Sequence, residues 1–426
     1  MIDRATVDKI LDATQIVDVI GDFVSLRRRG ANYLGLCPFH QDKNPSMSVS
    51  PTKGIFKCFS CGKSGTALSF LMEHEHLSYP EALKYLAAKY GIEVQEEEES
   101  PEQIAQRLKY ESLAIVSQYA GEYYQDYLFN SEHGKAIGLA YFKERGFSEL
   151  TIKKFGLGFS PIGRSTFVDA AKAKSYKEDI IVDAGLAIRR DNGEVVDRFY
   201  DRVMFPIHNI SGKIIAFGGR TLRTDKSVAK YINSPETELY NKSRSLYGIF
   251  FAKSAISKED KCYLVEGYTD VLSMHQAGIE NVVASSGTAL TVEQIRLIKR
   301  FTNKITIIYD GDEAGIKASL RGIDLILEQG MEVKVVLLPE NEDPDSFSKS
   351  RFKDQILSYI EANEKDFISY KSDLLLKDSE RDPIRRANVI NDVIASIAVI
   401  PDAIVRNVYV EEISQMFDLK SESIFT

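Results

Sequence analysis

Four side chains of types that bind metals lie close together near the amino terminus. Cys37 and His40 are separated by two residues, and Cys58 and Cys61 repeat that spacing in the next segment. Three thiolates and one imidazole suit Zn2+, and four protein ligands leave no coordination position open for a substrate. The pattern therefore predicts one structural zinc ion per chain. The remaining cysteine, Cys262, begins an apolar run, which predicts an inert packing residue.

Five carboxylates follow apolar runs in the second half of the chain. Glu266 comes after CYLV, Asp310 and Asp312 come after KITIIY, and Asp343 and Asp345 come after EVKVVLLP. In an open parallel sheet, ligands bind beyond the carboxyl ends of the strands. Oxygen ligands without nitrogen or sulfur favour Mg2+ or Mn2+, and such ions orient phosphates in phosphoryl transfer. The sequence therefore predicts a divalent-metal site at one edge of a sheet.

Basic residues surround the predicted zinc site and alternate with aromatic residues. Lysine and arginine contact phosphates, and exposed aromatic rings stack on unpaired bases. This pattern favours a contact with nucleic acid, and a solvated surface over a small aromatic core is the alternative. The basic residues are Arg27, Arg28, Arg29, Lys43, Lys53, Lys57 and Lys63, and the aromatic residues are Tyr33, Phe39, Phe56 and Phe59.

A second basic group lies in and around the segments RVMFPI, FGGRTL and KYINSPET. Arg220 follows two glycines, which permit close approach of another chain. Such a cluster suits nucleotide phosphates and a template backbone, and it reconciles a nucleic-acid partner with the net charge of −8. The group comprises Arg198, Arg202, Arg220, Arg223, Lys226, Lys230, Lys242, Arg244 and Lys253.

The elements that must position these side chains differ along the chain. Short strand-like runs, NYLGLC, SMSVS and GIFKC, carry the zinc ligands, and helical patterns flank them. From residue 261 apolar strands alternate with amphipathic helices, which is typical of a parallel sheet covered on both faces. Beyond about residue 350 the spacing is helical. We expect a multidomain protein of α+β and α/β class.

The length of 426 residues predicts about three domains. The acidic run EVQEEEESPEQ reads as a solvated linker. We expect a zinc-binding ribbon domain at 1–95, an acidic linker at 96–108, a basic mixed α/β subdomain at 109–240, a parallel-sheet subdomain at 241–345 and a helical subdomain at 346–426.

The composition excludes several other classes of protein. Apolar residues make up 44% and charged residues 27% of the chain, as in globular proteins, and no apolar run is long enough to span a membrane. Acidic residues interrupt the amino-terminal segment, which indicates an intracellular protein without a signal peptide. The run Gly62-Lys63-Ser64 lacks the first glycine of a P-loop, because Lys57 stands there, so an NTP-driven helicase is not expected.

The motifs, taken in order, closely resemble those of bacterial DnaG-type primases. The zinc pattern alone is shared with many proteins, and the glutamate with Asp-x-Asp is shared with other Toprim proteins. Their combination with KYINSPET is specific. The matching segments, from the amino terminus to about residue 350, are CPFH…CFSCG, RVMFPI, FGGR, KYINSPET, LYG, VEGYTDV, YDGDEAG and EDPDSF.

This resemblance implies a DNA primase, a nucleotidyltransferase that makes short RNA primers on single-stranded DNA from ribonucleoside triphosphates. It implies a Toprim fold for the parallel sheet and a cytoplasmic location at the bacterial replication fork. By motif, the zinc ligands are Cys37, His40, Cys58 and Cys61, and the Mg2+ or Mn2+ ligands are Glu266, Asp310, Asp312, Asp343 and Asp345. The first three of those acids are expected to be catalytic, and the template or nucleotide contacts are Arg145, Arg202, Arg220, Lys230 and Lys242.

Family members usually carry a further helical domain that binds the replicative helicase. The chain ends soon after the expected polymerase core, so we expect that domain to be absent here. Two alternatives are a Toprim nuclease or topoisomerase and a non-catalytic zinc-ribbon DNA-binding protein. A topoisomerase needs a nucleophilic tyrosine on a separate domain, and no segment of this sequence resembles one. A binding protein leaves the five carboxylates without a role.

Overall fold

A computed structural model describes most of the chain, and the described residues fall into two compact units, Met1–Arg107 and Leu108–Thr426. The predicted catalytic residues Asp310 and Asp312 lie outside the described residues. The described residues are 2, 4–75, 77–94, 100–223, 225, 227–287, 289–309, 322–376 and 383–419.

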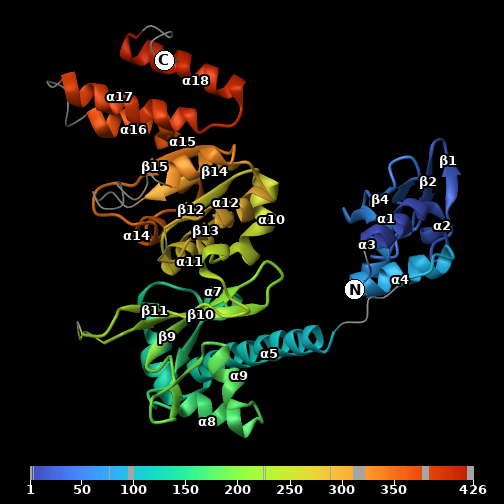
Figure 1. The fold of residues 1–426 in the computed structure, drawn as a ribbon, viewed down its shortest axis with the longest axis horizontal. Helices are drawn as coiled ribbons and strands as arrows, with labels where there is room; N and C mark the ends of the chain where they lie inside the picture. Colours follow the sequence, from blue (N-terminus) through green and yellow to red (C-terminus); the bar gives the residue numbers. More distant parts are fainter. Residues whose placement is uncertain are drawn as a thin grey trace. The chain divides into compact units, whose positions relative to one another are not determined.

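The first unit is an antiparallel sheet with helices packed on one face (Figure 1). Val49 and Phe56 of the sheet and Phe70 of a helix are fully buried between the two layers. The strands pair in chain order: β1 (Arg27–Arg29), β2 (Asn32–Gly35), β3 (Met47–Ser50), β4 (Ile55–Cys58) and β5 (Ser64–Thr66). The helices are α1 (Arg4–Ala13), α2 (Ile16–Gly21), α3 (Ala67–His74) and α4 (Tyr79–Lys89).

Alternation of side chains along β4 explains the two faces of this sheet. Phe56 and Cys58 are buried, whereas Ile55 and Lys57 are exposed on the opposite face. The three predicted strands of this region and the two helical patterns that follow them are confirmed. Gly91 adopts a left-handed φ of 66° just after α4, as expected for a residue that ends a helix.

The long helix α5 (Pro101–Asn130) begins inside the range 96–108 that we predicted to be a linker. The Ser100 hydroxyl accepts a hydrogen bond from the Gln103 N–H (3.3 Å), and Gln103 Oε1 accepts one from the Ser100 N–H (2.9 Å). This reciprocal cap, followed by proline in the first turn, is a strong helix start. The prediction gave weight to the acidic run and overlooked this cap, which is readable in the sequence.

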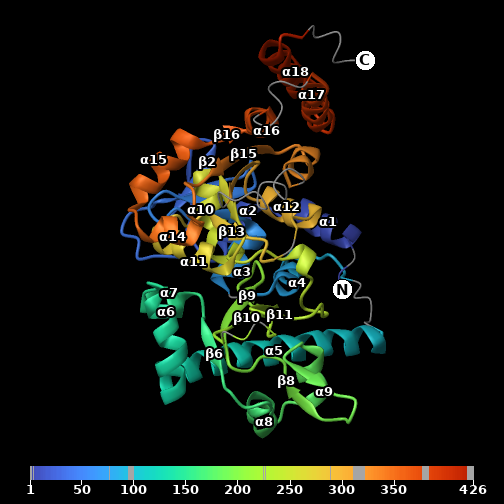
Figure 2. The same cartoon turned by 90° about the vertical axis from the view of Figure 1, so that its left-hand side faces the viewer.

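The second unit begins with a four-stranded antiparallel sheet beside α5 (Figures 1 and 2). Tyr124 of α5 packs edge-on against Phe217 of this sheet, with ring centroids 5.6 Å apart. The strands, in spatial order, are β11 (Tyr231–Asn233), β10 (Ile214–Thr221), β9 (Arg202–His208) and β6 (Gly158–Ser160). Around it lie η1 (Gly134–Leu139, a π-helix), α6 (Ala140–Glu144), α7 (Glu149–Lys154), α8 (Thr166–Ala173), α9 (Glu178–Asp183) and the ribbon β7 (Ala187–Arg189) with β8 (Val195–Asp197).

A mainly parallel sheet follows, as the alternation of strands and helices predicts. Its strand order is β13-β12-β14-β15-β16, and only β16 runs antiparallel to its neighbour among the described strands. The strands are β12 (Cys262–Val265), β13 (Val282–Ala284), β14 (Lys304–Tyr309), β15 (Glu332–Leu337) and β16 (Lys365–Asp366).

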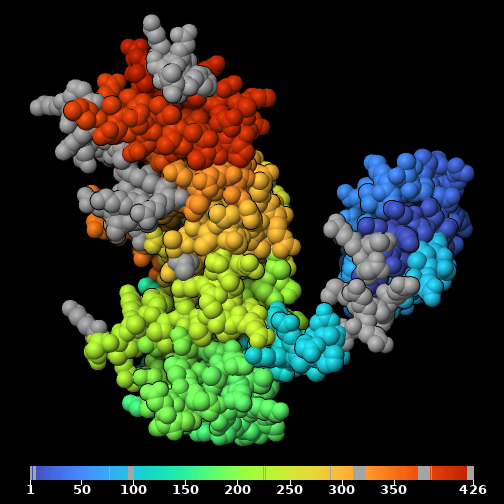
Figure 3. Space-filling view, viewed as in Figure 1, coloured from blue at the N-terminus to red at the C-terminus, as the bar shows by residue number. Residues whose placement is uncertain are grey.

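Helices cover both faces of the parallel sheet. On one face, alternate residues such as Val265 and Ile308 join the apolar cluster that includes α11 (Tyr268–Gln276), α14 (Pro344–Lys349) and α15 (Lys353–Asn363). On the other face, Leu264 and Ile307 pack with α10 (Ile249–Glu259) and α12 (Val292–Lys299). The first cluster continues into the antiparallel sheet, and Figure 3 shows the two sheet regions (green and yellow) as one continuous body.

Helices end the second unit, as the spacing beyond residue 350 predicts. They are α16 (Phe367–Leu376), α17 (Pro383–Ala398) and α18 (Ala403–Phe417). A separate short 3-10 turn, η2 (Lys242–Arg244), lies between β11 and α10. Buried Lys371 connects α16 to α17 and to the helical segment that precedes β15, because its ammonium group donates to Asp324 (3.1 Å) and to the hydroxyl of Ser396. Within the part of the chain that the structure describes, none of the helices combines the length and the apolar character needed to cross a bilayer.

Candidate functional site

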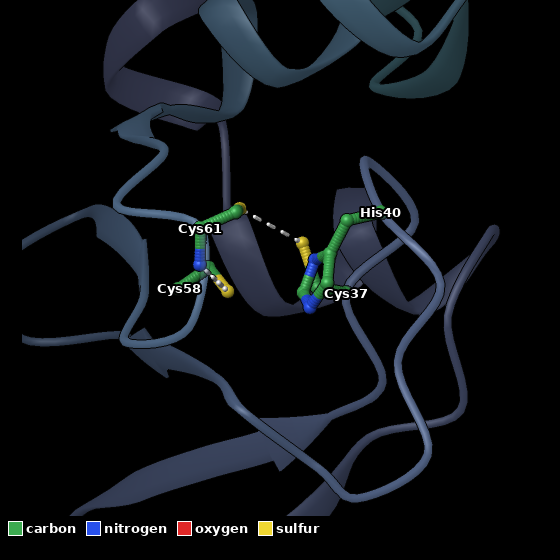
Figure 4. A group of neighbouring side chains, drawn as sticks. All are labelled: Cys37, His40, Cys58 and Cys61. Carbon is green, nitrogen blue, oxygen red and sulfur yellow. Dashed lines mark hydrogen bonds between the residues drawn. The ribbon is translucent and has the colours of Figure 1, made fainter.

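The four predicted zinc ligands converge in the first unit (Figure 4). Cys58 ends β4, Cys61 lies in the turn before β5, and Cys37 and His40 lie in the loop after β2. One ligand atom from each side chain lies within 4.8 Å of the other three. The Sγ atoms of Cys37 and Cys61 are 3.8 Å apart. Paired strands on both sides of the loops hold the four side chains in place.

Polar neighbours orient these ligands. Asp42 Oδ2 accepts hydrogen bonds from the Cys37 N–H (2.9 Å) and from the Ser46 hydroxyl (2.5 Å), and Asp42 Oδ1 lies 3.7 Å from His40 Nε2. Nδ1 of His40 is buried and has no hydrogen-bond partner among the described residues. A ring nitrogen aimed at three thiols, with a carboxylate beside the other nitrogen, is the arrangement of a metal-binding histidine. The residues therefore fit a tetrahedral zinc ion.

The exposed face of the same sheet carries two of the basic residues, Arg27 and Lys57, whereas Lys63 pairs with Glu73 of α3. The strand register places Arg27, Leu34, Ser48, Lys57 and Ser64 in one row across all five strands. Directly opposite residues in antiparallel strands point to the same side of a sheet, and Lys57 is on the exposed side. The row therefore places positive charge at both β1 and β4 on the face that the helices leave uncovered.

One ring of the predicted aromatic set is available on that face. Phe59 follows the exposed Lys57 by two residues, is 73% exposed and lies 5.8 Å from the Lys57 ammonium nitrogen. Phe56 is buried, and Phe39 packs against it with ring centroids 5.9 Å apart. The interleaved aromatic residues thus divide into a core set, Phe39 and Phe56 with the half-buried Tyr33, and one surface ring, which sequence spacing did not distinguish.

The second unit holds a cavity of about 1160 Å³ at the carboxyl ends of the parallel strands. It brings together four of the predicted site residues: Glu266, Asp343, Lys230 and Lys242. Glu266 comes directly after β12, and β12 pairs with β14, the strand that leads to Asp310 and Asp312. Two carboxylates, Glu266 and Asp343, that line one cavity with two lysines suit a bound cation together with phosphates.

Asp270, four residues after Glu266, lines the same cavity. It also caps α11, because Asp270 Oδ2 accepts a hydrogen bond from the Gly267 N–H (2.8 Å). This bond fixes the turn that follows Glu266. The capping bond and the place in the cavity are compatible, since a carboxylate has several acceptor positions.

Asp343 and Asp345 differ in their surroundings. Asp343 lines the cavity and caps α14, with its Oδ1 accepting from the Ser346 N–H at 2.7 Å. Burial raises the pKa of Asp343, but the Ser346 hydrogen bonds outweigh it and hold that pKa below its ordinary value. Asp345 is 3% exposed, and its oxygens contact Lys349 (2.7 Å), Arg145 (3.1 Å) and the Ser273 hydroxyl. The structure therefore does not place Asp345 among the cavity-lining acids.

Arg145 and Arg220 both lie near the ring of Tyr141. The guanidinium carbon of Arg220 is 5.2 Å from the ring centroid of Tyr141 and 5.4 Å from that of Tyr231, and Arg145 is 5.8 Å from Tyr141. A second cavity of about 780 Å³ lies between η1 with α6 and the β10–β11 hairpin, and Arg220 and Lys230 line it. Lys230 is thus shared by both cavities.

Arg202 does not join this group, contrary to our expectation of a template or nucleotide contact. It is 6% exposed, and its NH1 donates to the carbonyl oxygens of Gly219 and Ala229, each at 3.1 Å. A buried guanidinium that satisfies backbone acceptors holds the hairpin in shape. The sequence could not distinguish it from its exposed neighbours, because its partners are distant along the chain.

Three cavity residues escaped the sequence analysis: Tyr231, Asn233 and Tyr268. Tyr268 follows Glu266 by two residues, so its position beside a candidate acid was a usable signal. Asn233 carried none, because an uncharged amide within KYINSPET resembles any turn residue. Cys262 is fully buried, as predicted for a packing residue, and burial raises the pKa of its thiol far above its ordinary value.

Four family models match the chain. They are described as the CHC2 zinc finger (residues 2–102), the N-terminal domain of the DNA primase catalytic core (123–253), a Toprim-like domain (263–348) and the DnaB-helicase binding domain of primase (379–422). The last match contradicts our expectation that a helicase-binding domain is absent. That expectation rested on the length of the chain, whereas the match falls on α17 and α18.

The chain also resembles whole proteins. A DNA primase of Clostridium acetobutylicum is 38% identical over 98% of this chain and 69% of its own length. A DNA primase of Listeria innocua is 38% identical over 99% of this chain and 68% of its own length. These similarities extend through both units.

Solved structures give the same result for the fold. The zinc-binding and RNA polymerase domains of the Aquifex aeolicus primase match with a TM-score of 0.65 and 33% identity, and the match covers 98% of each chain. A DnaG primase catalytic domain bound to single-stranded DNA matches with a TM-score of 0.65 and 30% identity over 72% of this chain and 99% of that one. With a zinc ribbon, a catalytic core and a Toprim sheet in this order, the chain belongs to the DnaG-type DNA primases.

Proposed function

We propose that the cavity at the carboxyl edge of the parallel sheet is where this primase joins ribonucleotides into short RNA primers on single-stranded DNA. The observation that carries this proposal is that Glu266 and Asp343 share one cavity with Lys230 and Lys242. Carboxylates hold a cation and lysines hold phosphates, so both requirements of nucleotidyl transfer meet in one place.

The Toprim match assigns a divalent metal ion to this protein, and we propose that it is Mg2+ or Mn2+ held by Glu266, Asp310, Asp312 and Asp343. The donor set fits these ions, because all the proposed ligand atoms are carboxylate oxygens. When bound, such an ion stabilises the attacking and leaving oxygens of the transfer. Glu266, Asp310 and Asp312 are the proposed catalytic acids. Asp345, which we also predicted as a ligand, is better suited to positioning Arg145.

We assign the basic residues to two tasks. Lys230 and Lys242 face the carboxylates and would bind the triphosphate. Arg145 and Arg220, which both lie near the Tyr141 ring, would hold the template strand beside the hairpin. Much of the catalysis would then be positioning and electrostatics, supplied by side chains that the two sheets hold rigidly.

We propose that the first unit reads the template. Its zinc finger, with Cys37, His40, Cys58 and Cys61 as the proposed ligands, presents Phe59 beside Lys57 on an uncovered sheet face. An exposed ring beside cations suits an unpaired base and its phosphates.

The division of labour along the chain is also a proposal. We assign the zinc-binding domain to 1–95, the basic subdomain of the polymerase core to 109–240, the Toprim subdomain to 241–345 and the helical subdomain to 346–426. The match over 379–422 supports an interaction with a replicative helicase through α17 and α18. The bacterial relatives support a place in the cytoplasm at the replication fork.

The deciding experiment compares Glu266→Gln with Glu280→Gln. Glutamine keeps the size of the side chain but removes the charge that a cation needs, so Glu266→Gln should abolish primer synthesis on single-stranded DNA. Glu280 is an exposed residue that precedes β13, at the opposite ends of the parallel strands, so the same change there should leave synthesis intact. Near-normal synthesis by a folded Glu266→Gln variant would remove the proposal.

A further inference from the structure

Asn233 ties the two sheets of the second unit together at the edge of the proposed active site. Its Oδ1 accepts a hydrogen bond from the Tyr268 hydroxyl at 2.7 Å, and its Nδ2 donates to the carbonyl oxygen of Ser286 at 3.3 Å. Asn233 belongs to β11 of the antiparallel sheet, whereas Tyr268 and Ser286 follow β12 and β13 of the parallel sheet. One amide therefore bridges three segments of the chain.

Each of these bonds leads directly to Glu266. Tyr268 follows Glu266 by two residues at the start of α11, and the N–H of Ser286 donates to the carbonyl oxygen of Glu266 at 3.1 Å. The loops after β12 and β13 are thus bonded to each other and, through Asn233, to β11. Movement of β11 relative to these loops would move the Glu266 carboxylate.

The other end of the connection is Lys230, which directly precedes β11. Its carbonyl oxygen accepts a hydrogen bond from the N–H of Thr221 (3.0 Å), so the backbone of this lysine is held by the hairpin. The backbone of Asn233 is also held, because Arg198 donates to its carbonyl oxygen at 3.1 Å. A short, bonded segment therefore connects a proposed phosphate-binding lysine to the amide that fixes Glu266.

Close packing around the Asn233–Tyr268 hydrogen bond holds the Tyr268 ring in place. Tyr268 stacks on Phe205 with ring centroids 5.1 Å apart and an interplanar angle of 11°. Gly218, the strand partner of Asn233, lies beneath the Tyr268 ring, and a Cβ atom there would come within 2.6 Å of it. The hydroxyl of Tyr268 therefore reaches Asn233 in one orientation only, since the ring cannot shift toward the strand.

We propose that Asn233 is a positioning residue that sets the distance between the proposed triphosphate-binding lysines and the metal-binding Glu266. This inference rests on the proposed function of the cavity. The amide acts through Tyr268 and the Ser286 loop and does not touch the reacting atoms. Misplacing a reacting group by about 1 Å can lower the rate of the chemical step about 100-fold while substrate binding is kept. Loss of the junction should therefore lower kcat with little effect on KM.

The test uses the full chain and four variants. Tyr268→Phe removes one hydroxyl and keeps the stacked ring, Asn233→Ala removes the amide, and the double variant removes both. Asn281→Ala is the matched control, because Asn281 also donates to a backbone carbonyl, that of Lys261, at 2.8 Å, and it is more buried than the half-buried Asn233. Lys261 and Asn281 precede β12 and β13, at the opposite ends of the parallel strands.

Each of the two single variants should lower kcat by about fivefold or more and raise the divalent-ion concentration for half-maximal synthesis by about threefold. The kcat of the double variant should be within about twofold of that of the less active single variant, because both changes break the same connection. Template affinity and the apparent KM for nucleotides should stay within about twofold of the parent. Asn281→Ala should lower the melting temperature to a similar extent without changing kcat or the ion dependence.

Three outcomes would overturn the inference. Additive losses in the double variant would show that the two residues act separately. A raised KM for nucleotides in Asn233→Ala, with none in Tyr268→Phe, would show that the amide contacts the nucleotide itself. The same kinetic change in Asn281→Ala would reduce the effect to lost stability. If Glu266→Gln were active, the proposed function would fail instead, so the two failures are distinguishable.

Discussion

The carboxylate of Asp345 lies 3.1 Å from the guanidinium group of Arg145 and 2.7 Å from the ammonium group of Lys349. Asp345 is almost fully buried, whereas Arg145 retains about a quarter of its exposure. The Asp345–Arg145 ion pair joins α14 of the Toprim region to the end of α6. Asp345, in the segment Asp343-Pro344-Asp345, therefore holds two parts of the second unit together. Removing its charge would leave two cations without their partner.

Asp345→Asn should therefore lower the free energy of unfolding of the second unit by about 1–3 kcal/mol. Asp343→Asn should change it by less than about 0.5 kcal/mol, because asparagine caps a helix as well as aspartate does. Urea denaturation of both variants measures the difference. The effects on activity should be the reverse: Asp343→Asn should need a higher concentration of Mg2+ or Mn2+ for primer synthesis than Asp345→Asn. Equal losses of stability would contradict the separate roles of the two acids.

Removal of zinc should loosen residues 30–65 and leave the second unit folded. Three thiols and an imidazole lie within 4.8 Å of one another, so the ion that binds them supplies much of the folding energy of the loops that carry them. Hydrogen exchange before and after chelation gives the measurement. Cys37→Ser should lower the zinc content, whereas Cys262→Ala should retain one zinc ion per chain. Loss of protection in the parallel sheet on chelation would refute this prediction.

Phe59→Ala should weaken binding of single-stranded template by about 1–3 kcal/mol, the usual contribution of one base stacked on one ring. Because Phe59 is 73% exposed, the melting temperature of the first unit should stay unchanged. Fluorescence anisotropy of a labelled oligonucleotide at fixed salt gives the affinity. Tyr79→Ala is the control, since that ring is 46% exposed but lies on α4, in the helix layer. Equal effects of the two substitutions would mean that Phe59 has no special place in template binding.

Asp197 should make the second unit more stable at lower pH. Burial raises the pKa of this carboxyl from 3.8 to about 6, although it accepts hydrogen bonds from the N–H groups of Phe167 and Val168. A raised pKa means that the folded state binds the proton more tightly than the unfolded state. This contribution is complete below about pH 4 and declines by on the order of 2 kcal/mol as the pH rises through 6.

Asp197→Asn should abolish that part of the pH dependence. The informative quantity is the difference in unfolding free energy between parent and variant at pH values from 4 to 7, because other carboxylates titrate in both proteins. The unfolding free energy of the parent minus that of the variant should fall by on the order of 2 kcal/mol as the pH rises across this range. A difference that is constant with pH would show that Asp197 has an ordinary pKa in the folded protein.

Local patterns predicted most of the fold and the candidate ligands. The zinc ligands occur as two short-range pairs, and the acid after β12 follows from a rule about strand ends that needs no knowledge of contacts. The roles of Arg202 and Asp345 depend instead on partners far along the chain: the carbonyl of Ala229 for one and the guanidinium of Arg145 for the other. Burial of a charged side chain is a tertiary property, so residue type alone could not predict it.

The same limit explains the aromatic residues. Phe56 and Phe59 lie three positions apart on and after one strand, and both were equally good predictions for a base-stacking ring. Alternation along β4 points Phe56 into the core, whereas Phe59 lies in the turn after the strand and is exposed to solvent. The start of α5 is the opposite case, since the signal of Ser100 and Gln103 was present in the sequence and was outweighed by the acidic run beside it.

The exposed ring held between two proposed zinc ligands has a practical consequence for spectroscopy. The chain contains no tryptophan, so Phe59→Trp would carry its sole indole group. The side chain already lies mostly in water, and the larger ring needs no new space in the core. Its emission would therefore report on the zinc finger alone, quenched when a base stacks on it and shifted when chelation frees the turn. A single substitution would make template capture visible in real time without a label on the DNA.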